Sequence, residues 1–97
     1  MVVLDMRPVA VYTDFFVICS GRNTRQTTAI WDGVHETLKS EDRMLPRSVA
    51  GERDGTWIIA DYLDVVLHVF TPDARAFYRL EDLWADVPEI TLEAVAS

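Results

Sequence analysis

The first part of the chain holds short apolar runs on either side of a stretch with helical spacing. Residues 2–4 and 14–19 are almost entirely apolar, which is typical of strands that are covered on both faces. A third apolar piece over residues 44–49 contains Pro46, and proline cannot donate to a strand ladder. We therefore expect that piece to be an edge strand or an irregular one.

Between these runs, the residues from Asn23 to about Lys39 predict one helix. Asn23 is followed three positions later by Gln26, a spacing that resembles a capping box at a helix start. Apolar side chains then recur at four-residue spacing, which places them on one face of the helix. The expected buried stripe, with two residues beside it, consists of Ile30, Val34 and Leu38 with Thr27 and Trp31.

The later part of the chain predicts an antiparallel pair of strands. Asp54 and Gly55 form a turn signal before the apolar residues 56–60. Residues 61–64 separate that run from a second apolar run over residues 65–70. Two apolar runs joined in this way are typical of neighbouring antiparallel strands.

A last helix and a tail complete the pattern. Thr71 is a good helix cap and Pro72 fits the first helical position, so we expect a helix from there to about Trp84. Residues 89–97 show no partner element and are expected to form a frayed tail. The order of elements predicts a single α/β domain over residues 1–88, with a mixed sheet packed by helices.

Composition fits one globular domain in a reducing compartment. The 97 residues are 49% hydrophobic and 26% charged, which is enough to build one core. The single cysteine, Cys19, cannot form an internal disulfide, and this favours a cytoplasmic protein. The N-terminus lacks the pattern of a signal peptide, and no apolar run approaches membrane-spanning length. We expect no membrane association.

The net charge argues against direct binding to nucleic acid. Nine basic and 16 acidic residues give a formal net charge of -7, which disfavours contacts with phosphate groups. Residues 1–40 carry four acids and four bases, whereas residues 41–97 carry twelve acids and five bases. We therefore expect an acidic surface on the later part, which leaves basic protein partners open.

The strong catalytic motifs are missing. The four glycines match neither a P-loop nor a dinucleotide fingerprint. Lys39 stands where a helical zinc motif beginning at His35 needs its second histidine, so we expect His35 to be solvated. Cys19 has no cationic neighbour in the sequence, and Ser20 lacks the glycine of a nucleophile elbow. We interpret them as a packing residue and a strand end, and expect no cofactor or metal.

One group of side chains keeps an enzyme hypothesis open. Asp61, Asp64 and His68 lie near a predicted strand turn, and Asp14 stands at the entrance of another strand. Paired carboxylates can hold Mg²⁺ or serve as acid and base. Against this, aspartates in turns usually accept hydrogen bonds from nearby backbone N–H groups. A histidine on a buried strand is more often a hydrogen-bonded core or interface residue than a general base.

Aromatic and acidic residues also gather along the predicted strand pair and the helix after it. Aromatic anchors among charges are typical of protein interfaces, where they supply binding energy and steering. The alternative for Trp57 and Trp84 is that both rings fill the core. The candidate partner-binding residues are Trp57, Asp61, Tyr62, Asp64, His68, Tyr78 and Trp84.

An ordered series of motifs covers nearly the whole chain up to Trp84. The motifs are Val-Leu-Asp (3–5), Thr-Asp-Phe-Phe-Val-Ile-Cys-Ser-Gly (13–21), Arg-Gln (25–26), Ala-Ile (29–30), Gly-Thr-Trp (55–57), Asp-Tyr-Leu-Asp-Val-Val-Leu-His-Val-Phe (61–70) and Arg-Ala-Phe-Tyr-Arg-Leu-Glu-Asp-Leu-Trp (75–84). Together they resemble the ribosomal silencing factor family, also called Iojap-related. Two features depart from the family pattern: Leu63 stands where glycine is usual, and Met1 begins directly at the first expected strand, which an extra helix usually precedes in the family.

The resemblance implies a non-enzymatic factor that binds the fourteenth protein of the large ribosomal subunit, on the face that meets the small subunit. Bound there, it would sterically block subunit joining and repress translation. The resemblance also implies a nucleotidyltransferase-like α/β fold without a working active site. The alternative is a minimal nucleotidyltransferase that uses Asp14, Asp61 and Asp64 around Mg²⁺. A third hypothesis is a homodimer, because an exposed edge near residues 44–49 favours pairing between copies.

Overall fold

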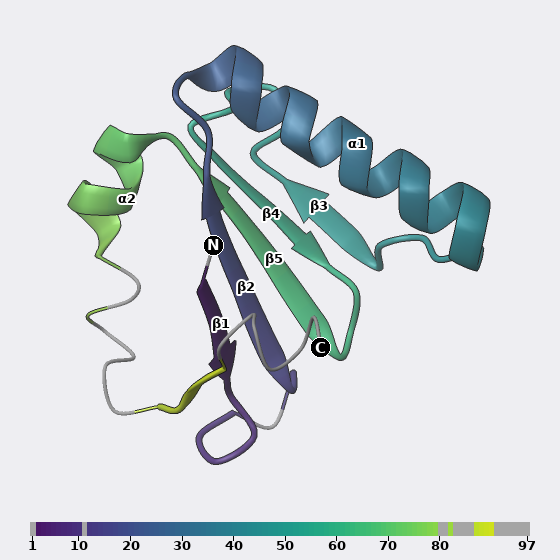
Figure 1. The fold of residues 1–97 in the computed structure, drawn as a ribbon, viewed down its shortest axis with the longest axis vertical. Helices are drawn as coiled ribbons and strands as arrows, with labels where there is room; N and C mark the ends of the chain where they lie inside the picture. The colour runs from purple at the N-terminus through teal and green to yellow at the C-terminus, as the bar shows by residue number, and fades with distance from the viewer. Residues whose placement is uncertain (1, 11, 80–81, 83–86, 91–97) are drawn as a thin grey trace.

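The computed structural model describes residues 2–10, 12–79, 82 and 87–90 (Figure 1). Its elements follow the chain in the predicted order, with one added strand at the end. They are β1 (Val2–Asp5), β2 (Phe15–Ser20), α1 (Thr24–Asp42), β3 (Ser48–Ala50), β4 (Trp57–Asp61), β5 (Val65–Phe70), α2 (Pro72–Tyr78) and β6 (Glu89–Ile90). Neither described helix has the length and apolar character needed to cross a bilayer.

The strands form one mixed sheet in the order β3-β4-β5-β2-β1-β6. The central pair, β2 and β5, is parallel, with Val17 opposite Leu67, and every other pair is antiparallel. A parallel pair needs a crossover connection, and the chain between β2 and β5 supplies it through α1, β3 and β4. The predicted α/β class and mixed sheet are therefore confirmed, whereas the nucleotidyltransferase likeness stays a prediction.

Helix α1 begins where the capping pattern predicts. The Gln26 backbone N–H donates to Asn23 Oδ1 at 2.9 Å, which satisfies one of the free N–H groups of the first turn. The Gln26 side chain accepts from the Arg22 backbone N–H at 2.6 Å, one residue earlier than in a standard capping box. The helix continues past Lys39 to Asp42 and ends at Arg43, which takes a left-handed φ of 53°.

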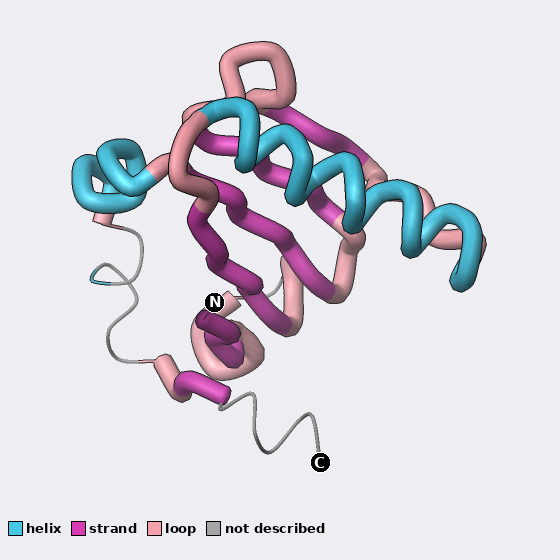
Figure 2. The backbone as a smooth tube through the Cα atoms, turned by 45° about the horizontal axis from the view of Figure 1, so that its top comes forward, coloured by secondary structure: helices cyan, strands magenta, loops and turns pink. Residues whose placement is uncertain are grey.

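The face of α1 that meets the sheet is centred beside the predicted stripe, and Ile30 and Val34 of that stripe pack at the margin of the core around Trp31. Thr27 and Trp31 are buried, whereas Ile30, Val34 and Leu38 are only half-buried. The reason is the placement of α1 over β4 and β5 (Figures 1 and 2), which centres the contact on Trp31. The predicted stripe is displaced toward β2, where the helix does not cover the sheet.

Alternation along the central strands builds a core on each face of the sheet. On the α1 face, Ile58 and Leu67 pack against Trp31. On the opposite face, Val66 and Phe70 pack with β1 and β2 residues and with Ala74 of α2. Strands β4 and β5 therefore contribute side chains to both cores.

Three boundaries differ from the predictions. Helix α2 ends at Tyr78 rather than near Trp84, because Arg79 turns left-handed with a φ of 51°. Residues 89–90 form β6 against β1, so this part of the expected tail has a partner; residues 91–97 lie outside the described residues. Strand β3 is an edge strand as expected, but it begins at Ser48.

Candidate functional site

Three of the candidate partner-binding residues meet on the sheet face opposite α1. The Trp57 ring of β4 lies 4.5 Å from the Tyr78 ring of α2 and is stacked on Phe70 at 4.9 Å, measured between ring centroids. The indole Nε1 of Trp57 donates to Nδ1 of His68 at 3.1 Å. Trp57 is half-buried and Tyr78 is 51% exposed. We call Trp57, His68, Phe70 and Tyr78 the aromatic face.

His68 is a buried member of the aromatic face. It is 5% exposed, and its ring meets Phe16 edge-on at 4.7 Å. Burial disfavours the charged imidazolium and lowers the pKa of His68 from 6.5 to about 4, so the ring is neutral near pH 7. Because Nδ1 accepts from Trp57, the proton sits on Nε2, which has no hydrogen-bond partner among the described residues. His68 is thus a hydrogen-bonded buried histidine, as expected, that positions Trp57.

Asp61 lies at the end of β4, on the same side as Trp57 by strand alternation. Arg47 donates to Asp61 Oδ2 at 2.6 Å, and the Leu63 backbone N–H donates to Oδ1 at 2.8 Å. Partial burial of the carboxyl opposes ionisation, but these two hydrogen bonds outweigh it and hold the pKa of Asp61 below its usual value. The second bond confirms the turn interpretation of Asp61.

Tyr62 and Asp64 lie on the other side of the sheet. Tyr62 packs with the α1-face core, its ring 6.4 Å from that of Trp31, and burial raises the pKa of its phenol. Both residues line a pocket beneath α1. The candidate set therefore divides between two faces: Tyr62 directly follows Asp61 and points to the opposite face, and Asp64 lines the same pocket as Tyr62. Trp84 lies outside the described residues.

The carboxylates of the enzyme hypothesis do not form a metal site in the described part of the chain. Asp14 and Asp64 are neighbours through a backbone hydrogen bond of 2.9 Å from Asp14 N to Asp64 O. Asp61 is engaged by Arg47, and no group of three ligating side chains is found among the described residues. Magnesium chemistry at these three residues thus finds no support in their arrangement.

The remaining candidates take structural positions. Cys19 is half-buried, and burial raises the pKa of its thiol, which favours the inert thiol. His35 is half-buried against Trp31, with ring centroids 5.1 Å apart, so the expectation of a solvated histidine is wrong. The ring turns inward because His35 is four residues after Trp31 on one helix face.

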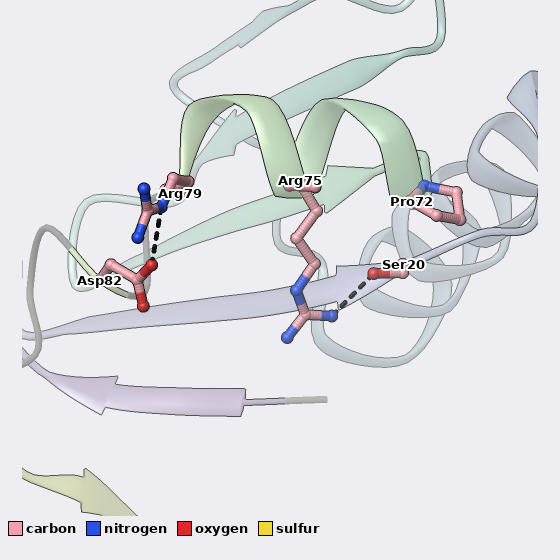
Figure 3. Close-up of a pocket in the computed structure, with 6 residues that line it drawn as sticks. Ser20, Pro72, Arg75, Arg79 and Asp82 are labelled. Carbon is pink, nitrogen blue, oxygen red and sulfur yellow. Dashed lines mark hydrogen bonds and ion pairs between the residues drawn. The ribbon is translucent and has the colours of Figure 1, made fainter.

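Two features near the aromatic face were missed in the sequence. Phe77 is 79% exposed and meets Tyr78 edge-on at 5.2 Å; an aromatic pair on one short helix was the available signal. Below α2, Arg75 donates to Ser20 Oγ at 2.7 Å and Arg79 pairs with Asp82 (Figure 3). This pocket joins the end of β2 to α2, a contact that sequence spacing does not reveal.

This chain is similar to known proteins in sequence and in fold. The chain matches the family model "Ribosomal silencing factor during starvation" over residues 1–97. "Ribosomal silencing factor RsfS" of Halalkalibacterium halodurans is 39% identical over 99 residues, covering 100% of this chain and 82% of the relative. A crystal structure from Bacillus halodurans has a TM-score of 0.78 at 34% identity and covers 93% of this chain and 80% of that chain.

A more distant relative is the mouse protein "Mitochondrial assembly of ribosomal large subunit protein 1". It is 34% identical over 87 residues, which cover 84% of this chain and 37% of the mouse protein. The full-length match to the family model, together with the Halalkalibacterium relative, decides the assignment: this chain belongs to the ribosomal silencing factor family.

Proposed function

We propose that this protein binds the large ribosomal subunit through its fourteenth protein and sterically blocks joining of the small subunit, which represses translation. Family membership supports a role at the ribosome, and the name of the mouse relative refers to the large subunit. The observation that carries the proposal is the pairing of exposed Tyr78 with half-buried Trp57, whose indole is held by a hydrogen bond to buried His68, on an acidic chain.

The aromatic face has the physical features of a docking surface. Tyr78 and its neighbour Phe77 are exposed and Trp57 is half-buried. An aromatic side chain buries about 150–250 Å² in all, and the part of each ring that is still exposed can be buried by a partner. The Trp57–His68 hydrogen bond fixes the indole before binding, so less side-chain entropy is lost when the partner docks. These rings are the anchors of the proposed interface.

The negative net charge of the chain indicates which kind of partner it binds. The chain carries a net charge of -7, and Asp61 lies on the same side of the sheet as Trp57. Acidic groups at the rim of an interface steer basic partners and repel nucleic acid, so we assign the contact to a basic protein surface. Tyr62 and Asp64, on the opposite side, would contact only a partner that wraps around the β4–β5 turn.

Occlusion requires affinity and bulk but no turnover. The protein measures 27 Å along its shortest axis, so a bound copy would hold two facing surfaces apart by many water layers. A cofactor or reacting group has no part in such a mechanism. We expect the protein to act in the cytoplasm on free large subunits.

The test is sedimentation of purified ribosomal subunits with and without saturating protein. We expect the joined ribosome to decrease with the parent protein, and Trp57→Ala and Tyr78→Ala to restore joining. Leu45→Ala is the matched control, because Leu45 is also exposed but lies in the connection before β3. Unchanged joining at saturation would refute the proposal. A pull-down with the purified fourteenth protein tests the partner separately.

The oligomeric state concerns a different surface, the edge of the sheet at β3. Among the described strands, β3 pairs with β4 alone and lies at the edge of the sheet, and pairing between two copies at this edge stays a prediction. A homodimer formed there would leave the aromatic face accessible, because that face includes the opposite end of β4. Sedimentation equilibrium of the isolated protein measures this directly.

A further inference from the structure

A hollow lies beside α2, at the end of the sheet where β2 and β5 finish. These strands are parallel neighbours, and Ser20 is opposite Phe70 in their last pair. The chain leaves β2 through α1, which packs on one face, and leaves β5 through α2, which packs on the other (Figures 1 and 2). In open α/β sheets, ligands bind beyond the carboxyl ends of parallel strands at the point where the connections diverge in this way.

This hollow brings two arginines to the end of β2. The Arg79 backbone N–H donates to the Arg75 carbonyl at 3.0 Å, so the two arginines are one helical turn apart and lie on one side of α2. Arg75 Nη1 donates to Ser20 Oγ at 2.7 Å (Figure 3). The volume of about 570 Å³ is within the range of roughly 300–1,000 Å³ typical of ligand sites. We call this hollow the arginine crevice; it is lined by Ser20, Pro72, Arg75, Ala76, Arg79 and Asp82.

The charge of the arginine crevice is opposite in sign to that of the whole chain. The chain carries a net charge of -7, whereas the lining contains two arginines and one aspartate. Arg79 Nε donates to Asp82 Oδ2 at 2.9 Å, and the two side chains are 70% and 66% exposed. An ion pair with this exposure holds its partners together weakly, so an anion of higher charge can replace the Asp82 carboxylate at Arg79.

The donors of the arginine crevice match the oxygens of a phosphate group. Guanidinium groups bind phosphate through paired N–H···O bonds. Because Ser20 Oγ accepts from Arg75, the hydroxyl keeps its own proton to donate, and no acceptor for that proton is found among the described residues. A phosphate monoester carries close to two negative charges and three acceptor oxygens. A carboxylate brings a single charge, which Asp82 already supplies to Arg79.

We propose that the arginine crevice binds the phosphate group of a small molecule, with Arg75 and Arg79 on its oxygens and the Ser20 hydroxyl as a further donor. Pro72 and Ala76 line the same crevice and offer apolar surface to the rest of the ligand. A nucleic acid is a poor occupant, because an acidic chain repels a polyanion. This site goes beyond the ribosomal role.

The test is titration of the ¹⁵N-labelled full chain with phenyl phosphate, benzoate and phenol, which share a ring and differ in the attached group. With phenyl phosphate we expect saturable chemical-shift changes at the Ser20 and Ala76 amides and at the Nε–H signals of Arg75 and Arg79. Phenyl phosphate should bind at least about tenfold more tightly than benzoate. No saturable change, equal affinity for benzoate or phenol, or changes confined to other parts of the chain would overturn the proposal.

Inorganic phosphate, as a fourth probe, distinguishes the two sources of the phosphate group. Binding as tight as that of phenyl phosphate supports a site for the free anion. Weaker binding supports a site for a phosphate ester whose remaining part contacts Pro72 and Ala76.

Two pairs of variants separate the arginine crevice from the net charge. Arg79→Gln should weaken the binding of phenyl phosphate about tenfold or more, whereas Arg53→Gln makes the same charge change at an exposed position outside the crevice and should weaken it less than about twofold. Asp82→Asn removes the competing carboxylate and should tighten binding about two- to fivefold, whereas Asp32→Asn on α1 should not. If the members of each pair behave alike, the affinity comes from net charge and the proposal is wrong.

Discussion

Trp57 and His68 lie diagonally across β4 and β5, with indole Nε1 3.1 Å from imidazole Nδ1. The two residues have unequal exposure: Trp57 is half-buried and His68 is buried. A histidine on the sheet face therefore acts from inside the protein, by fixing the tautomer and the orientation of a ring that reaches the surface. Its chemistry as a base is not accessible from solvent, whereas its effect on the shape of the aromatic face is direct.

Stability should depend on pH through His68. The pKa of His68 is lowered to about 4 in the folded state from 6.5, so between these values the unfolded chain binds a proton that the folded protein does not. Stability is then fully present above pH 6.5 and is lost as pH falls toward 4, by about 2 kcal/mol between pH 7 and pH 5. Urea unfolding at both pH values measures this difference.

The control for the pH effect is the same substitution at each histidine. His68→Gln should remove most of the difference between pH 7 and pH 5, while His35→Gln should retain it. Asp5 and Asp61, whose pKa values are lowered by Arg7 and Arg47, lose their contribution only at still lower pH. A parent protein with equal stability at both pH values would contradict the burial of a neutral His68.

Leu63 occupies a backbone conformation that favours glycine. Its φ is 76° in the β4–β5 turn, and its side chain is 53% exposed. The left-handed region costs a residue with a Cβ about 1–2 kcal/mol, whereas glycine loses about 0.5–1 kcal/mol of backbone entropy. Leu63→Gly should therefore raise the free energy of unfolding by about 0.5–1 kcal/mol, as measured by urea unfolding.

Alanine at position 63 separates the effect of the backbone conformation from the effect of the leucine side chain. Leu63→Ala retains the Cβ and its positive φ, so it should show no such gain. If Leu63→Ala and Leu63→Gly stabilise the protein equally, removal of the exposed leucine side chain would be the cause instead of the backbone conformation.

Substitution by alanine should change the stability in opposite directions at two glycines. Gly51 has a φ of 83°, and a Cβ there would collide with the Trp57 carbonyl, so Gly51→Ala should destabilise the protein by about 2 kcal/mol or more. A Cβ at Gly33 on α1 meets nothing within 4 Å, so Gly33→Ala should stabilise it by about 0.5–1 kcal/mol. Thermal unfolding of both variants measures these changes. A shift of the unfolding temperature in the same direction for both variants would contradict the assigned β3–β4 connection.

The Arg47–Asp61 ion pair should contribute little to stability. Its side chains are 59% and 21% exposed, and solvent-exposed pairs are typically worth about 0–1 kcal/mol. Asp61→Asn should therefore change the unfolding free energy by less than about 1 kcal/mol, yet slow association with the large subunit at low salt. Stopped-flow association at two salt concentrations measures this. An association rate independent of both salt and Asp61 would remove Asp61 from the proposed rim.

Local signals along the chain are enough to predict several of its elements. Capping at Asn23, proline at the first position of α2 and the apolar runs of β2, β4 and β5 each follow from bonds or burial within a few residues. The motif series indicates the family without reference to the fold. The position of Trp57, His68 and Tyr78 in one interface candidate was likewise within reach of sequence reasoning, although their mutual contacts were not.

The face of the protein that each side chain joins depends on how the elements pack. Helix α1 lies over β4 and β5 with Trp31 at the centre of the contact, so Ile30 and Val34 of its most regular apolar stripe pack only at the margin of the core. Periodicity gives the direction of a stripe but not the neighbour that meets it. Tyr62 lies on the side opposite Trp57 because side chains alternate along the strand from Asp61. The path of the chain through the β4–β5 turn, with Leu63 left-handed, is set by the pairing of the two strands rather than by local propensity.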